Sequence, residues 1–343
     1  MKRMKKQFSQ IYFPAKEQAA LRTEEFDSTL SPTQVLVKAD YDVLSAGTEL
    51  ANYHELPNTG TAKTGFPFSG IGYSVSGHVV EVGPAVTTLQ PGDNVVVRWS
   101  GHRSWFVQEE KNLFKIPPGI DQRQAAFAHL ASFSFLGVRK LQLQLGESAL
   151  VAGAGLLGLF AVQIARLSGA CPVLVSDFSP ERRELALQLG ADYALDPRDP
   201  DFVKKAVELT DGRGPEGVVE VTGFIPALQQ ALECIAWQGR ISLLGCTRIS
   251  DQPIDFYKYV HVRGVQLIGA HTKSRPKLES RPGEWTETDD YRAFLNLLKA
   301  GRIQVAPIIG EVVSAADAVN VYHRLNTAQK PPLGVLLDWT HVE

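Results

Sequence analysis

A glycine-rich turn between an apolar run and an amphipathic segment constrains this chain more than any other feature. In SALVAGAGLLGLFAVQIARLSGA, Gly153, Gly155 and Gly158 occur where a predicted strand becomes a predicted helix. Gly153 permits a tight turn, Gly155 lets the backbone approach a pyrophosphate, and Gly158 lets the helix pack closely on the strand. The first helical residues, Leu156 and Leu157, offer free N–H groups to the phosphates. The segment predicts a dinucleotide site; the alternative is a structural turn with incidental glycines.

The sequence around this turn predicts several more strands and helices, which together make a complete sheet. From about Gln122 onward, apolar runs alternate with segments of helical periodicity. Six apolar runs are candidate strands: SALVAG, CPVLVS, DYALD, GVVEVT, GRISLLG and GVQLIGA. Amphipathic segments separate the first five, which is typical of a parallel sheet covered by helices. The sequence therefore predicts an α/β fold with a doubly wound sheet of six parallel strands.

The first third of the chain has a different pattern. From about Phe8 to Lys115, short β runs are separated by Gly, Pro, Asn and Asp, which indicates an antiparallel barrel. The closing stretch, which includes PPLGVLLDW, has the same character. We therefore predict a discontinuous catalytic domain of residues 1–125 and 300–343, with a nucleotide-binding domain of residues 126–299 inserted into it.

Charge and composition exclude several classes of function. The 35 Lys and Arg residues are balanced by 37 Asp and Glu, so no net field would hold a nucleic acid. No run of 18 uncharged apolar residues is present, which argues against a membrane span or a secretion signal. The three cysteines, Cys171, Cys234 and Cys246, are scattered, which suits a reducing compartment. We expect a cytoplasmic protein that acts on a small molecule.

An acidic residue after the second predicted strand indicates which dinucleotide binds. Asp177, in VLVSDFSPERR, lies where a carboxylate accepts hydrogen bonds from the ribose hydroxyls of NAD and repels the extra phosphate of NADP. Arg182 could attract that phosphate, although a helix residue there is more often solvated. We therefore predict NAD(H) over NADP(H). Further cofactor candidates follow the later strands, where each could equally be an ordinary turn or loop residue: Thr222, Gly223, Gly245, Cys246 and His271.

Taken together, these features resemble the medium-chain dehydrogenase/reductase superfamily, which includes the zinc alcohol dehydrogenases, over nearly the whole chain. The resemblance rests on a barrel followed by the GAGLLG domain, on the phrases GHVVEVG and PGDNVVV, and on PERRELALQLGAD. It implies a GroES-like antiparallel β-barrel catalytic domain, a Rossmann domain and an NAD(P)-dependent oxidoreductase.

The resemblance breaks at the positions of the family's catalytic zinc. The phrase CGTD reads AGTE here, so Ala46 replaces the cysteine, and GHE becomes glycine, Tyr73 and Ser74. The third ligand position falls near Ala128 or His129. Because a catalytic zinc needs at least three protein ligands, we expect a zinc-independent enzyme. The phrases SAGTE and GYSVSG resemble a zinc-less branch that includes bacteriochlorophyllide-type dehydrogenases.

Without zinc, a side chain must donate a proton or a hydrogen bond to the developing alkoxide. Tyr73 is the first candidate, because a phenol can donate to an oxyanion, but it could equally fill the space left by the metal. Glu49 could orient polar groups or form a structural ion pair. His129 could shuttle protons or be a core histidine. Thr48 could bind the substrate oxygen or satisfy the backbone at a turn.

The leading hypothesis is hydride transfer between NAD(H) and a small alcohol or carbonyl substrate, such as a polyol or sugar derivative. Reduction of an activated C=C bond and a non-catalytic nucleotide-binding role are the alternatives. Substrate-pocket candidates, any of which could instead be a packing or loop residue, are Tyr53, Trp99 and His102. We also expect a homodimer joined through the apolar edge strand GVQLIGA, unless the loop HTKSRPKLESRPG covers that edge.

Overall fold

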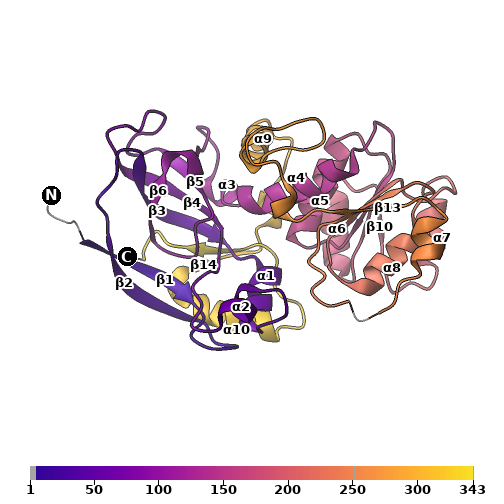
Figure 1. The fold of residues 1–343 in the computed structure, drawn as a ribbon, viewed down its shortest axis with the longest axis horizontal. Helices are drawn as coiled ribbons and strands as arrows, with labels where there is room; N and C mark the ends of the chain where they lie inside the picture. Colours follow the sequence, from indigo (N-terminus) through magenta and orange to yellow (C-terminus); the bar gives the residue numbers. More distant parts are fainter. Residues whose placement is uncertain (1–4, 251, 343) are drawn as a thin grey trace. The chain divides into compact units, whose positions relative to one another are not determined.

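The computed structural model describes residues 5–250 and 252–342, and within it the chain divides into two compact units. One unit contains the described residues up to His129 and those from Val305 onward, and the other is Leu130–Gln304. Figure 1 shows the ribbon coloured along the sequence. In the described part of the chain, no helix combines the length and hydropathy needed to span a bilayer.

The unit formed by the two ends of the chain is built on a seven-stranded sheet. Its strand order is β14-β15-β3-β4-β5-β7, and β6 pairs with β3. All pairs are antiparallel except β14 with β15. The strands are β3 (Gln34–Val43), β4 (Ser74–Val82), β5 (Asn94–Arg98), β6 (Trp105–Glu109), β7 (Leu113–Lys115), β14 (Glu311–Ser314) and β15 (Val335–Asp338), with a separate hairpin of β1 (Lys5–Tyr12) and β2 (Ala20–Asp27).

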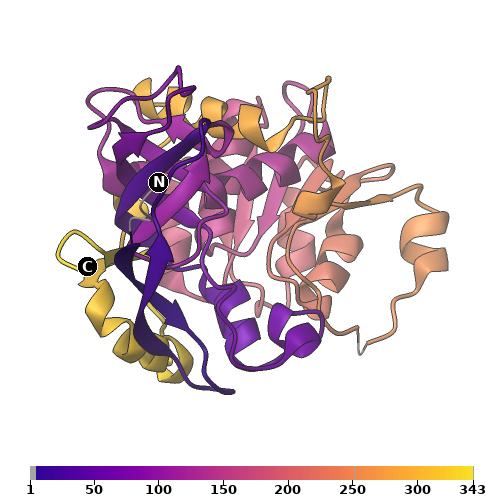
Figure 2. The same cartoon turned by 60° about the vertical axis from the view of Figure 1, so that its left-hand side comes forward.

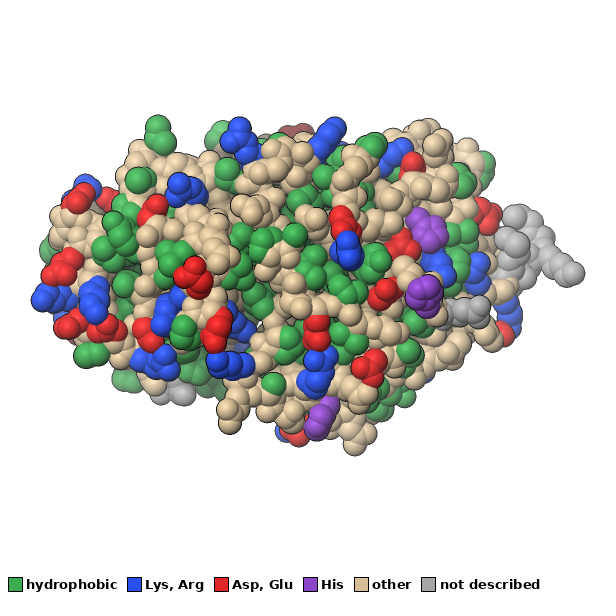
Figure 3. Space-filling view, turned by 180° about the vertical axis from the view of Figure 1, so that it is seen from behind, with side chains coloured by type: hydrophobic (Ala, Val, Ile, Leu, Met, Phe, Trp, Pro, Cys, Tyr) green, Lys and Arg blue, Asp and Glu red, His purple; other side chains and the backbone are tan. Residues whose placement is uncertain are grey.

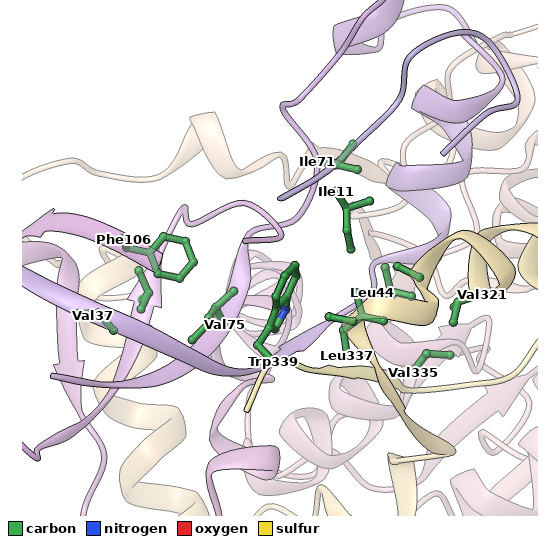
Figure 4. Close-up of a cluster of buried hydrophobic side chains, with 14 of the residues drawn as sticks. Ile11, Val37, Leu44, Ile71, Val75, Phe106, Val321, Val335, Leu337 and Trp339 are labelled. Carbon is green, nitrogen blue, oxygen red and sulfur yellow. The ribbon is translucent and has the colours of Figure 1, made fainter. Parts of the chain in front are cut away.

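The C-terminal segment completes this sheet and its core. Strand β15 lies between β14 and β3, with Leu336 opposite Val43. Trp339, which follows β15 and is fully buried, lies between Val75 and Leu337 in the core (Figure 4). Because VLLDW buries apolar side chains against strands from the first third of the chain, the two ends of the sequence form one hydrophobic core.

Short helices surround this sheet. Helix α10, in yellow, packs against β2 of the indigo hairpin (Figure 2). The helices of the unit are α1 (Ala46–Tyr53), α2 (Gly60–Thr64), α3 (Gln122–Ala125) and α10 (Ala318–Thr327), with short helical turns at Glu110–Asn112, Ala306–Ile308 and Ala315–Asp317.

The second unit confirms the predicted sheet of six parallel strands. Its order is β10-β9-β8-β11-β12-β13, so the chain reverses its direction across the sheet between β8 and β11. This is the doubly wound arrangement, in which ligands bind beyond the carboxyl ends of the strands at the reversal point. The strands are β8 (Ala149–Ala152), β9 (Val173–Ser176), β10 (Tyr193–Leu195), β11 (Gly217–Glu220), β12 (Arg240–Leu243) and β13 (Gln266–Gly269).

Helices connect the parallel strands because each crossover must return to the same end of the sheet. Pro180 begins α6 and Ser179 caps it, so this helix has both common N-terminal signals. The helices are α5 (Leu156–Leu167), α6 (Pro180–Gln188), α7 (Phe202–Glu208), α8 (Ile225–Cys234) and α9 (Glu287–Lys299), with short helical turns at Tyr257–His261 and Thr272–Ser274; α4 (Ala128–Leu141) spans the boundary between the units.

Charged side chains of both signs are interspersed on the surface. Figure 3 shows one face on which Lys and Arg side chains lie among Asp and Glu. This distribution agrees with the nearly balanced composition, and that face carries no extended field of one sign.

Candidate active site

The glycine turn has the geometry that a dinucleotide site requires. Gly153 has φ +107°, in the region that favours glycine. A Cβ atom at Gly158 would lie 1.8 Å from the carbonyl oxygen of Gly153, so only glycine allows α5 to pack so closely on the turn. Gly155 caps α5, and a Cβ there would meet no atom within 4 Å. Leu156 and Leu157 follow it as the first residues of the helix, whose N-terminal N–H groups suit phosphate oxygens.

Asp177 follows β9, and a hydrogen bond to its side chain holds the glycine turn at the end of that strand. Its Oδ2 accepts a hydrogen bond from the backbone N–H of Ala154 at 2.8 Å, and its Oδ1 accepts one from Ser179 at 2.8 Å. The carboxylate is therefore held beside the turn at the position expected for a ribose contact. Arg182 lies in the first turn of α6, where its backbone N–H donates to the Ser179 hydroxyl.

The turns after β11 and β12 pack against each other at the carboxyl edge of the sheet. A Cβ at Gly245 would lie 2.2 Å from the nitrogen of Gly223, whose own φ is +69°. The side chain of Glu220 holds the first turn, because its carboxylate accepts the N–H groups of Thr222 at 2.7 Å and Gly223 at 3.1 Å. Burial raises the pKa of Glu220. The sequence analysis missed this residue, although an acidic residue inside the apolar run GVVEV is an available signal.

Two further cofactor candidates lie at the same edge. Cys246, which directly follows Gly245, is exposed. His271 follows β13, and its Nδ1 accepts the backbone N–H of Lys273 at 3.1 Å. Burial, with the charge of Lys273, lowers the pKa of His271, which favours a neutral ring.

In the other unit, three aromatic rings meet at the predicted proton donor. The ring of Tyr73 lies 4.8 Å from that of His129 and 5.9 Å from that of Trp99, measured between centroids. The Trp99 and His129 rings are 4.5 Å apart. The Tyr73 hydroxyl donates a short hydrogen bond to the hydroxyl of Ser45, which the sequence analysis did not name. Three predicted residues therefore form one cluster, and a serine joins them.

Glu49 and His102 are brought together in the core, where Glu49 takes the alternative role of a structural ion pair and His102 also lines a pocket. His102 Nε2 lies 3.0 Å from Glu49 Oε2, and His102 Nδ1 lies 2.8 Å from Asp42 Oδ2. Tyr322 donates to Glu49, and the indole N–H of Trp339 donates to Asp42 at 2.8 Å. Glu49 is 1% exposed, so this carboxylate forms a structural ion pair. His102, at 2% exposure, is not an exposed loop histidine.

The electrostatics of this buried network favour the charged forms of His102 and Glu49. Burial alone lowers the pKa of His102, but the charges of Asp42 and Glu49 outweigh burial and raise it to about 10. Burial would raise the pKa of Glu49, yet the charge of His102 and the hydrogen bonds that Glu49 accepts lower it. Burial raises the pKa of Asp42. His102 is therefore a buried imidazolium at neutral pH.

The two remaining candidates lie in α1. Thr48 is within this helix and not at a turn, and its carbonyl accepts the Asn52 side-chain amide at 2.9 Å. Tyr53 is 5% exposed and packs in the core, with its ring 5.4 Å from that of Phe13 and 6.2 Å from that of Tyr322. The structure thus places Tyr53 in packing contacts, which was the alternative to a pocket role.

The residues at the family's zinc-ligand positions do not fit a zinc ion. Ser74 is fully buried and its hydroxyl donates to the carbonyl of Ala126 at 2.5 Å, while Tyr73 is engaged by Ser45. Ala46 has no ligand atom. Among residues 5–250 and 252–342, no three His, Cys, Asp or Glu side chains are grouped to hold a metal ion. This donor set offers no thiolate and at most the single imidazole of His129, whereas a catalytic zinc needs three protein ligands.

Comparison with known proteins identifies the family. Residues 31–136 match the alcohol dehydrogenase GroES-like domain, and residues 157–288 match the zinc-binding dehydrogenase family. The L-threonine 3-dehydrogenase of Thermococcus kodakarensis is 31% identical over 293 residues, which cover 76% of this chain and 79% of that protein. The chain belongs to the medium-chain dehydrogenase/reductase superfamily.

Other relatives agree with this assignment. The 2-dehydro-3-deoxy-L-galactonate 5-dehydrogenase of Pseudoalteromonas atlantica is 27% identical, covering 82% of this chain and 84% of that enzyme. Among solved structures, the alcohol dehydrogenase of Thermus sp. ATN1 superposes with a TM-score of 0.78 at 25% identity, covering 96% of this chain and 99% of that one. This medium-chain dehydrogenase is an NAD(P)-dependent oxidoreductase that acts on a small alcohol, and its GroES-like and Rossmann domains are as predicted.

Proposed function

We propose that this dehydrogenase is a zinc-independent member of its superfamily that transfers a hydride between NAD(H) and a polyol or sugar-derived alcohol. The observation that carries the proposal is the hydrogen bond of Tyr73 to Ser45: the resemblance implies a zinc ligand at the position of Tyr73, and Ser45 directly precedes Ala46, another such position. Relatives named for dehydrogenation of a galactonate derivative and of sorbitol support a polyhydroxylated substrate class.

The proposed chemistry assigns proton transfer to this chain's own residues. When bound, the nicotinamide supplies the hydride to the substrate carbonyl carbon, or accepts it from the alcohol. In the reductive direction, the Tyr73 hydroxyl gives its proton to the carbonyl oxygen as the C=O bond becomes an alcohol. Ser45, which accepts the hydrogen bond of Tyr73, would relay a proton from solvent to the phenolate, so that its own hydroxyl is unchanged at the end of the step. The ring of His129, 4.8 Å from that of Tyr73, is the second candidate for the proton transfer.

Activity should survive removal of divalent metal ions, because Ala46, Tyr73 and Ser74 provide no zinc site. The measurement is turnover of sorbitol, galactonate and threonine with NAD+, and of matched ketones and enones with NADH, before and after dialysis against a chelator, together with metal analysis. We expect alcohol oxidation at an unchanged rate and less than stoichiometric zinc. One zinc per chain with loss of activity in chelator would contradict zinc independence, and turnover of enones alone would replace the alcohol assignment.

The cofactor preference should change when the carboxylate at position 177 is replaced. The double variant Asp177→Ser, Phe178→Arg removes the repulsion of a 2′-phosphate and adds a cation at an exposed neighbour. We expect the ratio of NADPH to NADH affinity to rise by a factor on the order of 10 or more, measured by nicotinamide fluorescence. The control is Asp201→Ser, an exposed aspartate of the same unit. Tighter binding of NADPH than NADH by the unmodified protein would contradict the NAD(H) proposal.

Two copies of the chain should associate through β13. Within the described residues this strand pairs with β12 alone, so one of its edges presents backbone donors and acceptors. We propose a dimer, which light scattering at micromolar concentration would detect as twice the 37.6 kDa mass of one chain. Ile268→Lys places a charge on the edge strand and should shift the population toward monomers. A mass of one chain for the unmodified protein would contradict this proposal.

A further inference from the structure

A pocket of about 310 Å³ lies wholly within the unit that contains Tyr73. Three short segments line it: Gln10 on β1, the stretch 69–72, and the stretch 99–103 between β5 and β6. The backbone fixes these segments to one another, because Ile11 N–H donates to the carbonyl of His102 at 3.0 Å and His102 N–H donates to that of Ile71 at 3.1 Å. Backbone hydrogen bonds therefore hold the segments that line the pocket together.

Arg103 contributes a largely buried cation to this pocket. Its Nε is buried and makes no hydrogen bond, and its guanidinium carbon lies 4.9 Å from the centroid of the Phe106 ring. Within the described residues, no carboxylate pairs with it, and only burial acts on its pKa, which is lowered. A guanidinium removed from water without a counter-charge is costly, so an anion supplied from outside would stabilise it.

A second polar group on the same wall also lacks a partner. Ser100 is 5% exposed, and its hydroxyl is buried without a hydrogen bond. A buried hydroxyl left unsatisfied costs about 1–3 kcal/mol, so its retention at a pocket wall points to a ligand atom. Gln10 and Ser69 add polar side chains to the lining. A guanidinium and a hydroxyl that line one pocket match the donors that bind carboxylates and phosphates.

The nearby carboxylates do not cancel this preference. Of the network of Asp42, His102 and Glu49, only the cationic His102 lines the pocket. Glu24 is occupied by Arg22 at 3.0 Å and by the amide of Gln10 at 2.6 Å, and it does not line the pocket either. The charges that face the pocket are therefore positive.

The pocket adjoins the candidate proton donor. Trp99, which lines it, is the residue whose ring contacts those of Tyr73 and His129. Gly72, which also lines it, directly precedes Tyr73. Trp99 has φ +53°, a conformation that is strained for a bulky residue. A molecule bound in this pocket would therefore lie beside the aromatic cluster that contains Tyr73.

We propose that Arg103 and Ser100 bind an oxyanion of the substrate, a carboxylate or a phosphate, so that the enzyme acts on an acidic polyol or sugar derivative. This inference rests on the proposed function for the reaction itself. It adds to that function the requirement that the substrate carries a negative charge.

Binding of simple anions tests the pocket independently of turnover. Inorganic phosphate and acetate are titrated by calorimetry into the intact protein saturated with NADH, which keeps the dinucleotide's own phosphate site filled. We expect one of the two anions to bind, which distinguishes phosphate from carboxylate, and its affinity to fall at least about tenfold in Arg103→Gln and in Ser100→Ala. The control is Arg324→Gln, which removes an exposed arginine of the same unit that pairs with Glu311.

Turnover of matched substrates then tests the assignment to the substrate. We compare kcat/KM for sorbitol, sorbitol 6-phosphate and gluconate. We expect an acidic member to exceed sorbitol by at least about tenfold, and Arg103→Gln to abolish that difference by raising KM for the acidic member. The control Arg324→Gln should leave both the preference and kcat for sorbitol unchanged. Arg103→Lys, which keeps the positive charge but lacks the planar guanidinium with its paired N–H donors, should retain part of the preference for the acidic substrate.

The outcomes separate this inference from the proposed function. Failure of both anions to bind, or equal binding by the wild type and Arg103→Gln, contradicts the proposal that this pocket binds an oxyanion. An equal loss of turnover for acidic and neutral substrates in Arg103→Gln also overturns it. If anion binding depends on Arg103 but the protein oxidises none of the alcohols, the anion-binding role of the pocket is supported and the proposed reaction is contradicted.

Discussion

Replacing Tyr73 by phenylalanine is expected to lower the turnover number by about a hundredfold or more. General acid catalysis contributes about this factor, which corresponds to a loss of roughly 3 kcal/mol of transition-state stabilisation. The substitution keeps the ring that contacts His129 and Trp99, at centroid distances of 4.8 and 5.9 Å, and removes only the hydroxyl that donates to Ser45. Folding and NADH binding should therefore persist, and the loss should lie in kcat.

The measurement compares turnover of Tyr73→Phe and His129→Gln at saturating NADH. Tyr53→Phe is the matched control, because it removes a phenol that the structure places among packed core rings of the same unit. Full turnover of Tyr73→Phe together with a large loss in His129→Gln would transfer the proton-donor role to the histidine.

Replacing His102 by glutamine is expected to destabilise the protein by about 3–5 kcal/mol. The substitution removes the cation that lies between Asp42 and Glu49, whose carboxylates lie 2.8 and 3.0 Å from the ring nitrogens. Breaking a buried ion pair on one side leaves uncompensated buried charge, which is far more costly than losing an exposed pair. Urea unfolding followed by circular dichroism measures the change. His78→Gln is the control, because His78 is 38% exposed beside Asp40 and such pairs contribute about 0–1 kcal/mol.

The stabilisation by His102 should depend on pH in a defined direction. Its pKa is raised from 6.5 to about 10 in the folded protein, so folding favours the protonated ring. Its contribution is complete below pH 6.5, declines as the pH rises above that value and is lost as the pH passes through about 10. The difference in unfolding free energy between wild type and His102→Gln should shrink across this range. A constant difference from pH 6 to 10 would contradict a charged His102.

Local sequence patterns were sufficient to predict the Rossmann unit. The six apolar runs became the six parallel strands, because helical and strand periodicities are local properties of the chain. The glycine turn was equally readable: Gly153 needs a positive φ and Gly158 leaves no room for a Cβ, and both constraints act between residues close in sequence. Glu220 was missed there because its partners, the N–H groups that follow β11, exist only once the turn has formed.

Tertiary structure decided the chemistry of the other unit. The sequence by itself identified Tyr73, Glu49, His102, Trp99 and His129 as polar or aromatic candidates, but it could not say which of them meet. The fold brings Tyr322 and Trp339 from the end of the chain against Glu49 and Asp42, and this closes the network around His102. These contacts join residues nearly 300 positions apart. No local pattern records such contacts, because pairing of β15 with β3 and burial of the shared core create them.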